Sequence, residues 1–389
     1  MCRDREPNRT DATVAAHSRR RPRHPQKQPL MLKVQHPKVL VIGAGAVGQV
    51  YGYHMTRGGA EVSVLVKPKY RDEALGGWSL KQHRLFGMSQ KSYRWVPHQV
   101  FTSLREAKGI WHQVWLAVPS PALSEPWIQD LQHCVGDATV VLLTPGINDF
   151  QILAEHYPAN KIVSGMISMV SYAAPLPGQN LDKCTAYFFP PFSPSPFQGP
   201  SERATSAAEF LQRGGCPASV VKDARIQGAL ASSIMMPMIV GLEQEGWELK
   251  RFLNSATFDL SLAAATQALA IVKREFALQS TKIERLINPK LLKFGLSMAP
   301  VFAPFPLEPY LQVHFTKVRS QTDQMMQRYI MLSERHDLPA AKITSLYAQW
   351  RRGEVAASLS QSFPAITSAD SSLAIGVVSA VGLDEETEP

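Results

Sequence analysis

The chain has 389 residues, of which 45% are hydrophobic and 19% are charged, a composition that is ordinary for a globular protein and excludes wholesale disorder. Its net charge of +9 is concentrated in the arginine-rich N-terminus, so the remainder lacks the basic surface expected of a nucleic-acid-binding domain. No uninterrupted apolar run reaches the roughly 18 residues of a membrane span. The 4 cysteines are widely spaced and indicate neither a disulfide framework nor a metal site. We therefore expect a cytoplasmic protein that binds no nucleic acid, membrane or metal.

The first half of the chain has the pattern of a doubly wound α/β domain. Short apolar runs alternate with helix-length segments, at KVLVIG, AEVSVLVK, HQVWLAVPS, ATVVLLTPG and VSGMISMVSY. Continuous apolar runs of this length are typical of parallel strands that are buried on both faces. The proline-rich segment FFPPFSPSPFQGP, at residues 188–200, predicts a surface loop or a lid without any regular element.

The second half predicts helices, in DARIQGALASSIMMPMIVGLEQEG, TFDLSLAAATQALAIVKREFALQSTKIERL and PYLQVHFTKVRSQTDQMMQRYIMLSERHDLP. The expected fold class is therefore α/β, a Rossmann-type dinucleotide-binding domain followed by an all-helical C-terminal domain. The predicted boundaries are a disordered basic leader at 1–35, the Rossmann-type domain at 36–217, a helical substrate or dimerisation domain at 218–355 and a disordered tail at 356–389. The leader is either a non-functional extension ahead of Met31 or a segment for organelle targeting or polyanion binding, and both interpretations stay open.

A glycine-rich loop follows the first predicted strand. The stretch KVLVIGAGAVGQVYG places Gly43, Gly45 and Gly48 at the spacing G-x-G-x-x-G. The first glycine allows the tight turn, the second lets backbone amides approach a pyrophosphate, and the third lets the helix pack closely on the strand. A purely structural turn is the alternative, but the strand before and the helix after favour a dinucleotide. The predicted cofactor-binding residues of this loop are Gly43, Ala44, Gly45, Ala46, Val47 and Gly48.

The end of the second predicted strand indicates which dinucleotide is bound. NAD-binding domains usually place an acidic residue there, to hold the 2′-hydroxyl of the ribose. In VSVLVKPKYRD this place is taken by Lys67, with Lys69 and Arg71 close behind and no acid before Asp72. Cations at this point favour the 2′-phosphate of NADP, unless these lysines belong only to a solvated loop. We therefore predict NADP as the cofactor, with Lys67 as a binding residue.

This combination of features resembles the ketopantoate reductase family, whose members are NADP-dependent reductases of a 2-oxo acid. The resemblance rests on KVLVIGAGAVGQVYG, on the basic end of the second strand and on the helical second half. In the helical part, RIQGALASSIMMPM keeps the frame of the family's catalytic helix with Pro237 as its anchor. LQVHFTKVRSQTDQMMQRYIMLSERHDL matches the family's last long helix without a gap. The resemblance covers roughly Lys38 to Trp350.

The family's site residues do not keep their identities here. Its catalytic lysine falls on Gly228, and its glutamate, which helps hold substrate, falls on Gln321. The other transferred positions are Ser232 and Met236 for two asparagines, Pro145 for a third, Pro309 for a serine and Pro119 for a lysine near the cofactor. Reduction of a 2-oxo acid needs a group that polarises the carbonyl and one that protonates the alkoxide, and Gly228 can do neither.

Other side chains on the same predicted helix faces could replace the missing groups. Arg225 lies three positions before Gly228, and His314 and Lys317 lie seven and four positions before Gln321 on what the pattern predicts to be one helix. His314 could act as a general acid near neutral pH. A surface cation or a half-buried, hydrogen-bonded histidine is the plainer interpretation of each. The predicted catalytic set is Arg225, His314, Lys317 and Gln321.

Three functions stay open on this sequence. The first is an NADP-dependent oxidoreductase that acts on a 2-oxo acid or related small molecule, with ketopantoate itself a doubtful substrate and a homodimer as an open alternative to a monomer. The second is a non-catalytic NADP-binding sensor or scaffold. The third is an opine-dehydrogenase-like enzyme, because LAVPSPALSEPWIQDLQHCVGDATVVLLTPG is similar to the corresponding stretch of that family.

Overall fold

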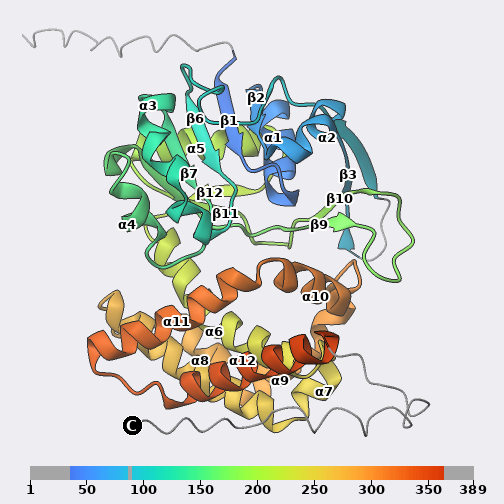
Figure 1. The fold of residues 1–389 in the computed structure, drawn as a ribbon, viewed down its shortest axis with the longest axis vertical. Coiled ribbons are helices and arrows are strands. Elements are labelled where there is room, and N and C mark those ends of the chain that lie inside the picture. Colours follow the sequence, from blue (N-terminus) through green and yellow to red (C-terminus); the bar gives the residue numbers. More distant parts are fainter. Residues whose placement is uncertain (1–35, 86–89, 363–389) are drawn as a thin grey trace, which may run out of the picture. The chain divides into compact units, whose positions relative to one another are not determined.

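A computed structural model describes residues 36–85 and 90–362 of the chain. The first part is an α/β domain built on an eight-stranded sheet, and Figure 1 shows its arrangement above the helical part. The strand order is β12-β11-β8-β7-β6-β1-β2-β5. All neighbouring strands are parallel except β11, which runs antiparallel to β8. The strands are β1 (Lys38–Ile42), β2 (Glu61–Leu65), β5 (Val100–Phe101), β6 (Gln113–Leu116), β7 (Thr139–Leu142), β8 (Ile162–Gly165), β11 (Ser195–Gln198) and β12 (Ala218–Val220).

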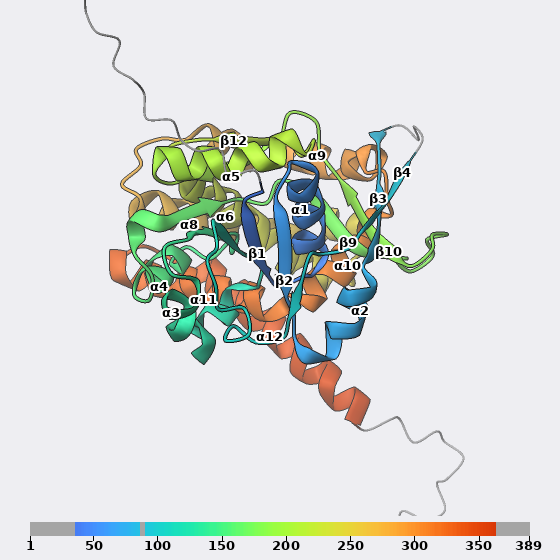
Figure 2. The same ribbon diagram turned by 90° about the horizontal axis from the view of Figure 1, so that it is seen from above.

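The parallel strands are buried on both faces, as their continuous apolar sequences predict. Along β1, Val39 and Val41 face a core shared with α1 (Ala46–Arg57) and α5 (Ser201–Arg213). Leu40 and Ile42 face the opposite core, shared with α3 (Leu131–Val135) and α4 (Asp149–Ala154). Figure 2 shows these two helix layers on either side of the strands. The short helices η3 (Ser120–Ser124) and η4 (Pro126–Asp130) complete the second layer, and the short helix η5 (Ala159–Lys161) precedes β8.

A second, four-stranded sheet covers the outer side of α1. Its strands are β3 (Trp78–Gln82), β4 (Lys91–Trp95), β9 (Val170–Ala174) and β10 (Cys184–Phe188), in the order β4-β3-β10-β9. A Cβ atom at Gly52 of α1 would come 2.3 Å from the ring of Trp95, so only glycine lets the helix lie this close. The sequence pattern did not predict this sheet. VSGMISMVSY, expected to be one strand, contains the end of β8 and the start of β9, which belong to different sheets.

The proline-rich segment is not entirely irregular, contrary to the prediction. Strand β11 lies within it and includes Pro196. Proline fits because the antiparallel pairing with β8 begins at the next residue, Phe197, and the carbonyl of Pro196 still accepts a hydrogen bond from Met166 N at 3.0 Å.

The second half of the described chain is helical, as expected. Its helices are α6 (Ala224–Gln244), α7 (Leu249–Leu253), α8 (Ala256–Glu275), η6 (Lys282–Ile287), α9 (Pro289–Phe302), α10 (Leu307–Lys317), α11 (Arg319–His336) and α12 (Ala341–Ser362). A Cβ atom at Gly241 would come 2.1 Å from Ser261 Oγ, so α6 and α8 cross at close range. Helix α6 is long and apolar enough to span a membrane, but 67% of its most apolar window is buried inside the protein, as in a core helix.

Two details differ from the sequence pattern. The expected single helix across Gln321 is divided at Val318, whose φ of −107° and ψ of 25° end α10 and precede α11. Helix α12 continues to Ser362, past the predicted start of the C-terminal tail at Ala356. The disorder predicted for residues 1–35 and for the rest of that tail lies outside the described residues.

Candidate functional site

The glycine loop joins β1 to α1 at the point where the strand order of the large sheet changes direction. Strand β1 has β2 on one side and β6 on the other, so chain crossovers leave β1 in opposite directions. In open α/β sheets, ligands bind outside the carboxyl ends of the strands at such a point. Gly43 follows β1 directly, with a positive φ of 95°, and its N–H donates to Leu65 O at 3.0 Å.

Two of the three glycines are required by close backbone packing. A Cβ atom at Gly43 would come 2.6 Å from the carbonyl oxygen of Ala117, which follows β6. A Cβ atom at Gly48 would come 2.1 Å from the carbonyl oxygen of Gly43 and 3.2 Å from Val41 Cγ1. These contacts bring β1, β6 and α1 together at the switch point, as the spacing of the glycines predicts.

Gly45 differs from its two neighbours, because nothing lies within 4 Å of the position that its Cβ atom would occupy. It is the N-cap residue of α1, and the first turn of that helix carries no acidic side chain. The free N–H groups and the dipole of a helix N-terminus attract anions. The loop therefore has both the open space and the electrostatic character that a pyrophosphate needs, and the residues present fit a dinucleotide.

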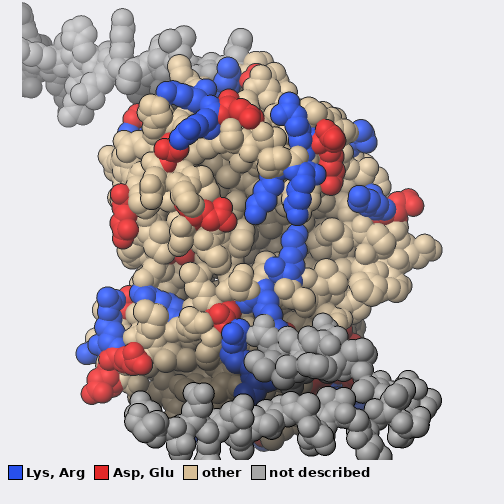
Figure 3. Space-filling view, viewed as in Figure 1, with Lys and Arg blue, Asp and Glu red and all other residues tan. Residues whose placement is uncertain are grey.

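Lys67 lies immediately past the carboxyl end of β2 and is exposed. It is the N-cap of η1 (Pro68–Tyr70), and Lys69 and Arg71 beside it are also exposed. The nearest acids, Asp72 and Glu73, lie in the first turn of α2 (Arg71–Gly76), where Glu73 accepts a hydrogen bond from Trp78 Nε1 at 3.2 Å. Figure 3 shows Lys and Arg side chains forming a line down the face that it draws. The end of β2 is thus positive rather than acidic.

The carboxyl ends of β6 and β7 carry a small buried polar network. Ser120 Oγ donates a hydrogen bond to Asp149 Oδ2 at 2.7 Å, and Gly146 N donates to the same oxygen at 2.8 Å. Ser120 is 2% exposed and Asp149 is 4% exposed, so the network is shielded from solvent. The nearby Thr144 hydroxyl is buried and has no hydrogen-bond partner among the described residues. This edge of the sheet therefore contains polar groups that packing alone does not require.

Arg225, in the first turn of α6, reaches the same edge. Its guanidinium carbon lies 4.2 Å from the centre of the Phe150 ring, which belongs to α4. Within residues 36–85 and 90–362 this guanidinium makes no hydrogen bond or ion pair, and burial lowers its pKa. A partly desolvated cation without an acceptor is costly, and an anionic ligand would relieve that cost.

Gly228 lies where the resemblance places a catalytic lysine. A Cβ atom there would lie 3.6 Å from Met166 Sδ, just past the end of β8, so this helix position faces the carboxyl edge of the sheet. Ser232 and Met236, one and two turns further along α6, are 5% and 3% exposed and belong to the interior. Pro119 and Pro145, the transferred positions on the sheet side, are exposed. None of these four side chains supplies a charged group.

Gln321 contacts the α/β domain directly. Its Oε1 accepts a hydrogen bond from the backbone N–H of Ser120 at 3.4 Å, and α11 packs against η3. Arg225 and Gln321 therefore both contact elements that the Ser120–Asp149 hydrogen bond joins, namely η3 and α4.

His314 and Lys317 belong to α10 and not to the helix of Gln321, because the chain breaks at Val318. The His314 ring stacks on Tyr310 with centroids 5.4 Å apart. Burial lowers the pKa of His314, and the charge of Lys317 lowers it further. Lys317 is exposed. No hydrogen bond, ion pair or ring contact in the described part of the chain joins these two side chains to Arg225 or Gln321, so the predicted four-residue set is not one polar network.

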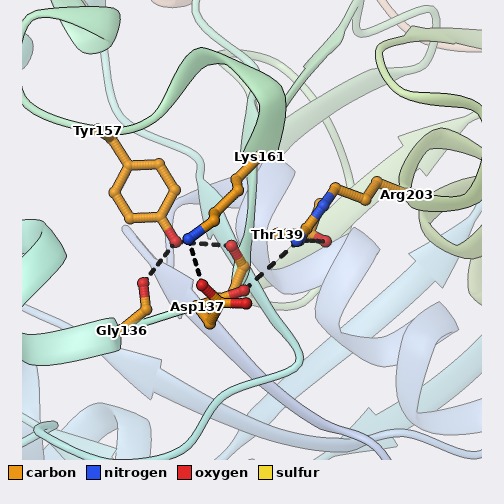
Figure 4. Close-up of polar contacts among 7 residues, drawn as sticks. Gly136, Asp137, Thr139, Tyr157, Lys161 and Arg203 are labelled. Atoms are coloured by element: carbon orange, nitrogen blue, oxygen red, sulfur yellow. Dashed lines mark hydrogen bonds and ion pairs between the residues drawn. The ribbon is translucent and has the colours of Figure 1, made fainter.

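A second polar cluster lies at the opposite, amino end of β7 (Figure 4). Tyr157 donates hydrogen bonds to Gly136 O at 3.0 Å and to Ala138 O at 2.6 Å, and burial raises the pKa of its hydroxyl to about 12. Lys161 pairs with Asp137, and Arg203 donates to Thr139 Oγ1 at 2.8 Å. Because ligands bind at the carboxyl ends of parallel strands, we assign this cluster to holding the turn before β7.

Sequence reasoning missed Ser120, Asp149 and Phe150. Each of them follows a predicted strand within a few residues, in LAVPS and in LLTPGINDF, and polar residues at the ends of adjacent parallel strands are a recognisable signal. In these two motifs, the resemblance to the family assigns site positions to Pro119 and Pro145 instead.

Both the sequence and the fold of this chain are similar to known proteins. Residues 39–178 match the family model described as ketopantoate reductase PanE/ApbA. The fold is similar to 2-dehydropantoate 2-reductase from Geobacter metallireducens GS-15, with 15% identity over 81% of this chain and 99% of that chain and a TM-score of 0.61. The corresponding enzyme from Methylococcus capsulatus is 18% identical over 82% and 98%, with a TM-score of 0.58.

A ternary structure of D-mandelate dehydrogenase with NADH and anilino(oxo)acetate has the same fold, with 15% identity over 82% of this chain and 98% of that chain and a TM-score of 0.61. No curated protein matches the sequence. At these identities the structural likenesses establish the fold alone, and the family model matches only residues 39–178 of the 389-residue chain.

Proposed function

We propose that this chain, of which residues 39–178 match the ketopantoate reductase family model, is an NADP-dependent oxidoreductase that reduces a 2-oxo acid or a related carbonyl compound. The observation that carries the proposal is Arg225. This half-buried cation, with no acceptor within the described residues, lies at the same sheet edge as the glycine loop and one turn before the vacant lysine position at Gly228.

The chain's own residues would hold NADP as follows. The N–H groups at the start of α1, beside the open space at Gly45, bind the pyrophosphate. Lys67 pairs with the 2′-phosphate at the end of β2, a position that offers no carboxylate for a 2′-hydroxyl. When bound, the reduced nicotinamide supplies the hydride for the reaction.

Arg225 binds the carboxylate of the 2-oxo acid in this proposal. A guanidinium holds a carboxylate through two parallel hydrogen bonds, and the low-polarity surroundings that lower the Arg225 pKa also strengthen that pairing. The same charge stabilises the alkoxide that develops on the neighbouring carbon. The cation–π contact with the Phe150 ring, 4.2 Å from the guanidinium carbon, holds this side chain in place.

His314 is the proposed proton donor, in its protonated form only. Because burial and Lys317 lower its pKa below the usual 6.5, this form is populated at acidic rather than neutral pH. Lys317, exposed at the end of α10, attracts the anionic substrate without contacting it. The cytoplasmic location and the homodimer remain predictions, and sedimentation velocity of the full chain would test the second.

A second function is favoured by the side chains around Gly228. Gly228 faces Met166, and Pro119 and Pro145 stand in place of polar family residues, so the chain could bind NADP as a sensor or scaffold without turnover.

One experiment separates the two functions. Full-length protein is titrated with NADPH and with NADH, following nucleotide fluorescence, and a panel of 2-oxo acids that includes ketopantoate and phenylglyoxylate is then added. The enzyme proposal predicts tighter binding of NADPH and its oxidation by at least one acid. NADPH binding without oxidation by any acid supports the non-catalytic function, and failure to bind either nucleotide contradicts both.

A further inference from the structure

Ser120 and Asp149 join the ends of two neighbouring strands into one unit. Ser120 is the first residue of η3 after β6, and Asp149 is the first residue of α4 after β7. Both hydrogen bonds of the network end on the same carboxylate oxygen, Oδ2, at 2.7 Å from Ser120 Oγ and 2.8 Å from Gly146 N. A Cβ atom at Gly146 would come 2.1 Å from Asp149 Oδ1, so glycine is required for the carboxylate to sit there.

The same serine is also the contact point of Gln321. The backbone N–H of Ser120 donates to Gln321 Oε1 at 3.4 Å. A backbone N–H can only donate, so the side-chain amide must present its oxygen to Ser120 and its –NH₂ group elsewhere. That –NH₂ group makes no hydrogen bond to any residue that the structure describes. Its two N–H donors are available at the edge of the sheet that Arg225 also reaches.

We propose that Asp149 and Ser120 are positioning residues, which orient Gln321 so that its –NH₂ group donates to an oxygen of the bound 2-oxo acid. Asp149 fixes the Ser120 turn through Oδ2, the Ser120 N–H fixes the amide orientation, and Gln321 then supplies a donor. The inference rests on the proposed function for the identity of the oxygen, and on the hydrogen bonds of Ser120 for the orientation of the amide.

The first test uses three variants, Asp149→Asn, Ser120→Ala and Gln321→Leu, in the full-length protein. The dissociation constant of NADPH should stay within about twofold of wild type in each, because none of them contacts the glycine loop. The KM for the reduced 2-oxo acid should rise about tenfold or more in Gln321→Leu and by a smaller factor in the other two. Equal KM values in wild type and Gln321→Leu would overturn the proposal.

The matched controls are Gln324→Leu, at an exposed glutamine on α11, and Ser124→Ala, at an exposed serine in η3. Both should leave the KM and the dissociation constant of NADPH unchanged.

A second experiment does not need turnover. Amide hydrogen exchange at Ser120 should accelerate in Gln321→Leu and in Asp149→Asn, with no change in Gln324→Leu. If the wild type reduces no 2-oxo acid, the proposed function fails, but the exchange rate still tests whether Gln321 bonds to the Ser120 N–H. Identical exchange rates at Ser120 in wild type and Gln321→Leu would overturn the positioning role.

Discussion

A Cβ atom on Gly48 would come 2.1 Å from the carbonyl oxygen of Gly43, so the first and third glycines of the loop pack directly against each other. The second glycine is not constrained in this way, since a Cβ atom at Gly45 has no neighbour within 4 Å. The same motif therefore contains positions required by packing and a position left open for a ligand.

Alanine substitutions separate these two roles. Gly48→Ala forces backbone atoms apart and should lower the free energy of unfolding by about 2 kcal/mol or more. Gly45→Ala should leave thermal stability nearly unchanged, because its φ of −69° suits any residue, yet it should weaken NADPH binding by filling the space of the pyrophosphate. Thermal melts and NADPH titrations of both variants test this. A stable Gly48→Ala protein or full NADPH affinity in Gly45→Ala would contradict the described loop.

Lys67 should determine the preference between the two nucleotides. Lys67→Ala removes the charge proposed to pair with the 2′-phosphate, so the dissociation constant of NADPH should rise about tenfold while that of NADH stays the same. Lys91→Ala, an exposed lysine on β4, serves as the matched control. An equal loss of affinity for NADPH and for NADH in Lys67→Ala would show that this lysine does not recognise the 2′-phosphate.

The rate of reduction should depend on pH through His314. Since only imidazolium can donate the proton, and burial lowers the His314 pKa below 6.5, kcat/KM should rise as the pH falls below about 6.5. In His314→Gln this rise should disappear. Rates are measured between pH 5 and pH 8 in buffers of constant ionic strength, and a wild-type profile that His314→Gln leaves unchanged would remove His314 from the mechanism.

Stability should also depend on pH, through His54 of α1. This ring is 1% exposed, its Nδ1–H donates to Gly214 O at 2.8 Å, and burial lowers its pKa to about 4. In the unfolded chain His54 binds its proton near pH 6.5. The contribution of neutral His54 to the free energy of unfolding is therefore fully present above that pH and is lost as the pH falls towards 4. The loss should reach about 3 kcal/mol.

Urea denaturation at pH 7, 5.5 and 4.5 measures that loss. His156 provides a control, since its side chain makes no hydrogen bond or ion pair to the described residues and His156→Gln should leave the pH dependence as it is in wild type. His54→Gln should be less stable at pH 7 and should lose less stability between pH 7 and pH 4.5. Parallel stability profiles for His54→Gln and wild type would contradict the assignment.

The sequence predicted the parts of the fold that local pattern determines. The five apolar runs became β1, β2, β6, β7 and β8, because strands buried on both faces need continuous apolar sequence. The second sheet was missed, since polar residues interrupt the apolar pattern of β3 (WSLKQ) and β4 (KSYRW), and β3 pairs with β10, a strand distant in the chain. The prolines of residues 188–200 predict a segment without strands, but Pro196 occupies a strand position just before the pairing with β8 begins.

The candidate site was predictable only where a motif requires a particular backbone. Gly43 and Gly48 are such positions, and the structure gives the packing reason for each. The grouping of His314 and Lys317 with Gln321 assumed one helix, and the break at Val318 separates them. Contacts between distant segments, such as Ser120 with Gln321 or Arg225 with Phe150, depend on how the helical region packs on the sheet and leave no periodic signal.

The most direct test of the central proposal compares wild type with Arg225→Ala on two substrates, a 2-oxo acid that the wild type reduces and the methyl ester of the same acid. If Arg225 binds the carboxylate, kcat/KM for the acid should fall about a hundredfold in Arg225→Ala, while the value for the ester changes little. Arg225→Lys should recover only part of the loss, because lysine cannot form the paired hydrogen bonds. Equal losses for acid and ester, or no reduction of any 2-oxo acid by the wild type, would contradict the account.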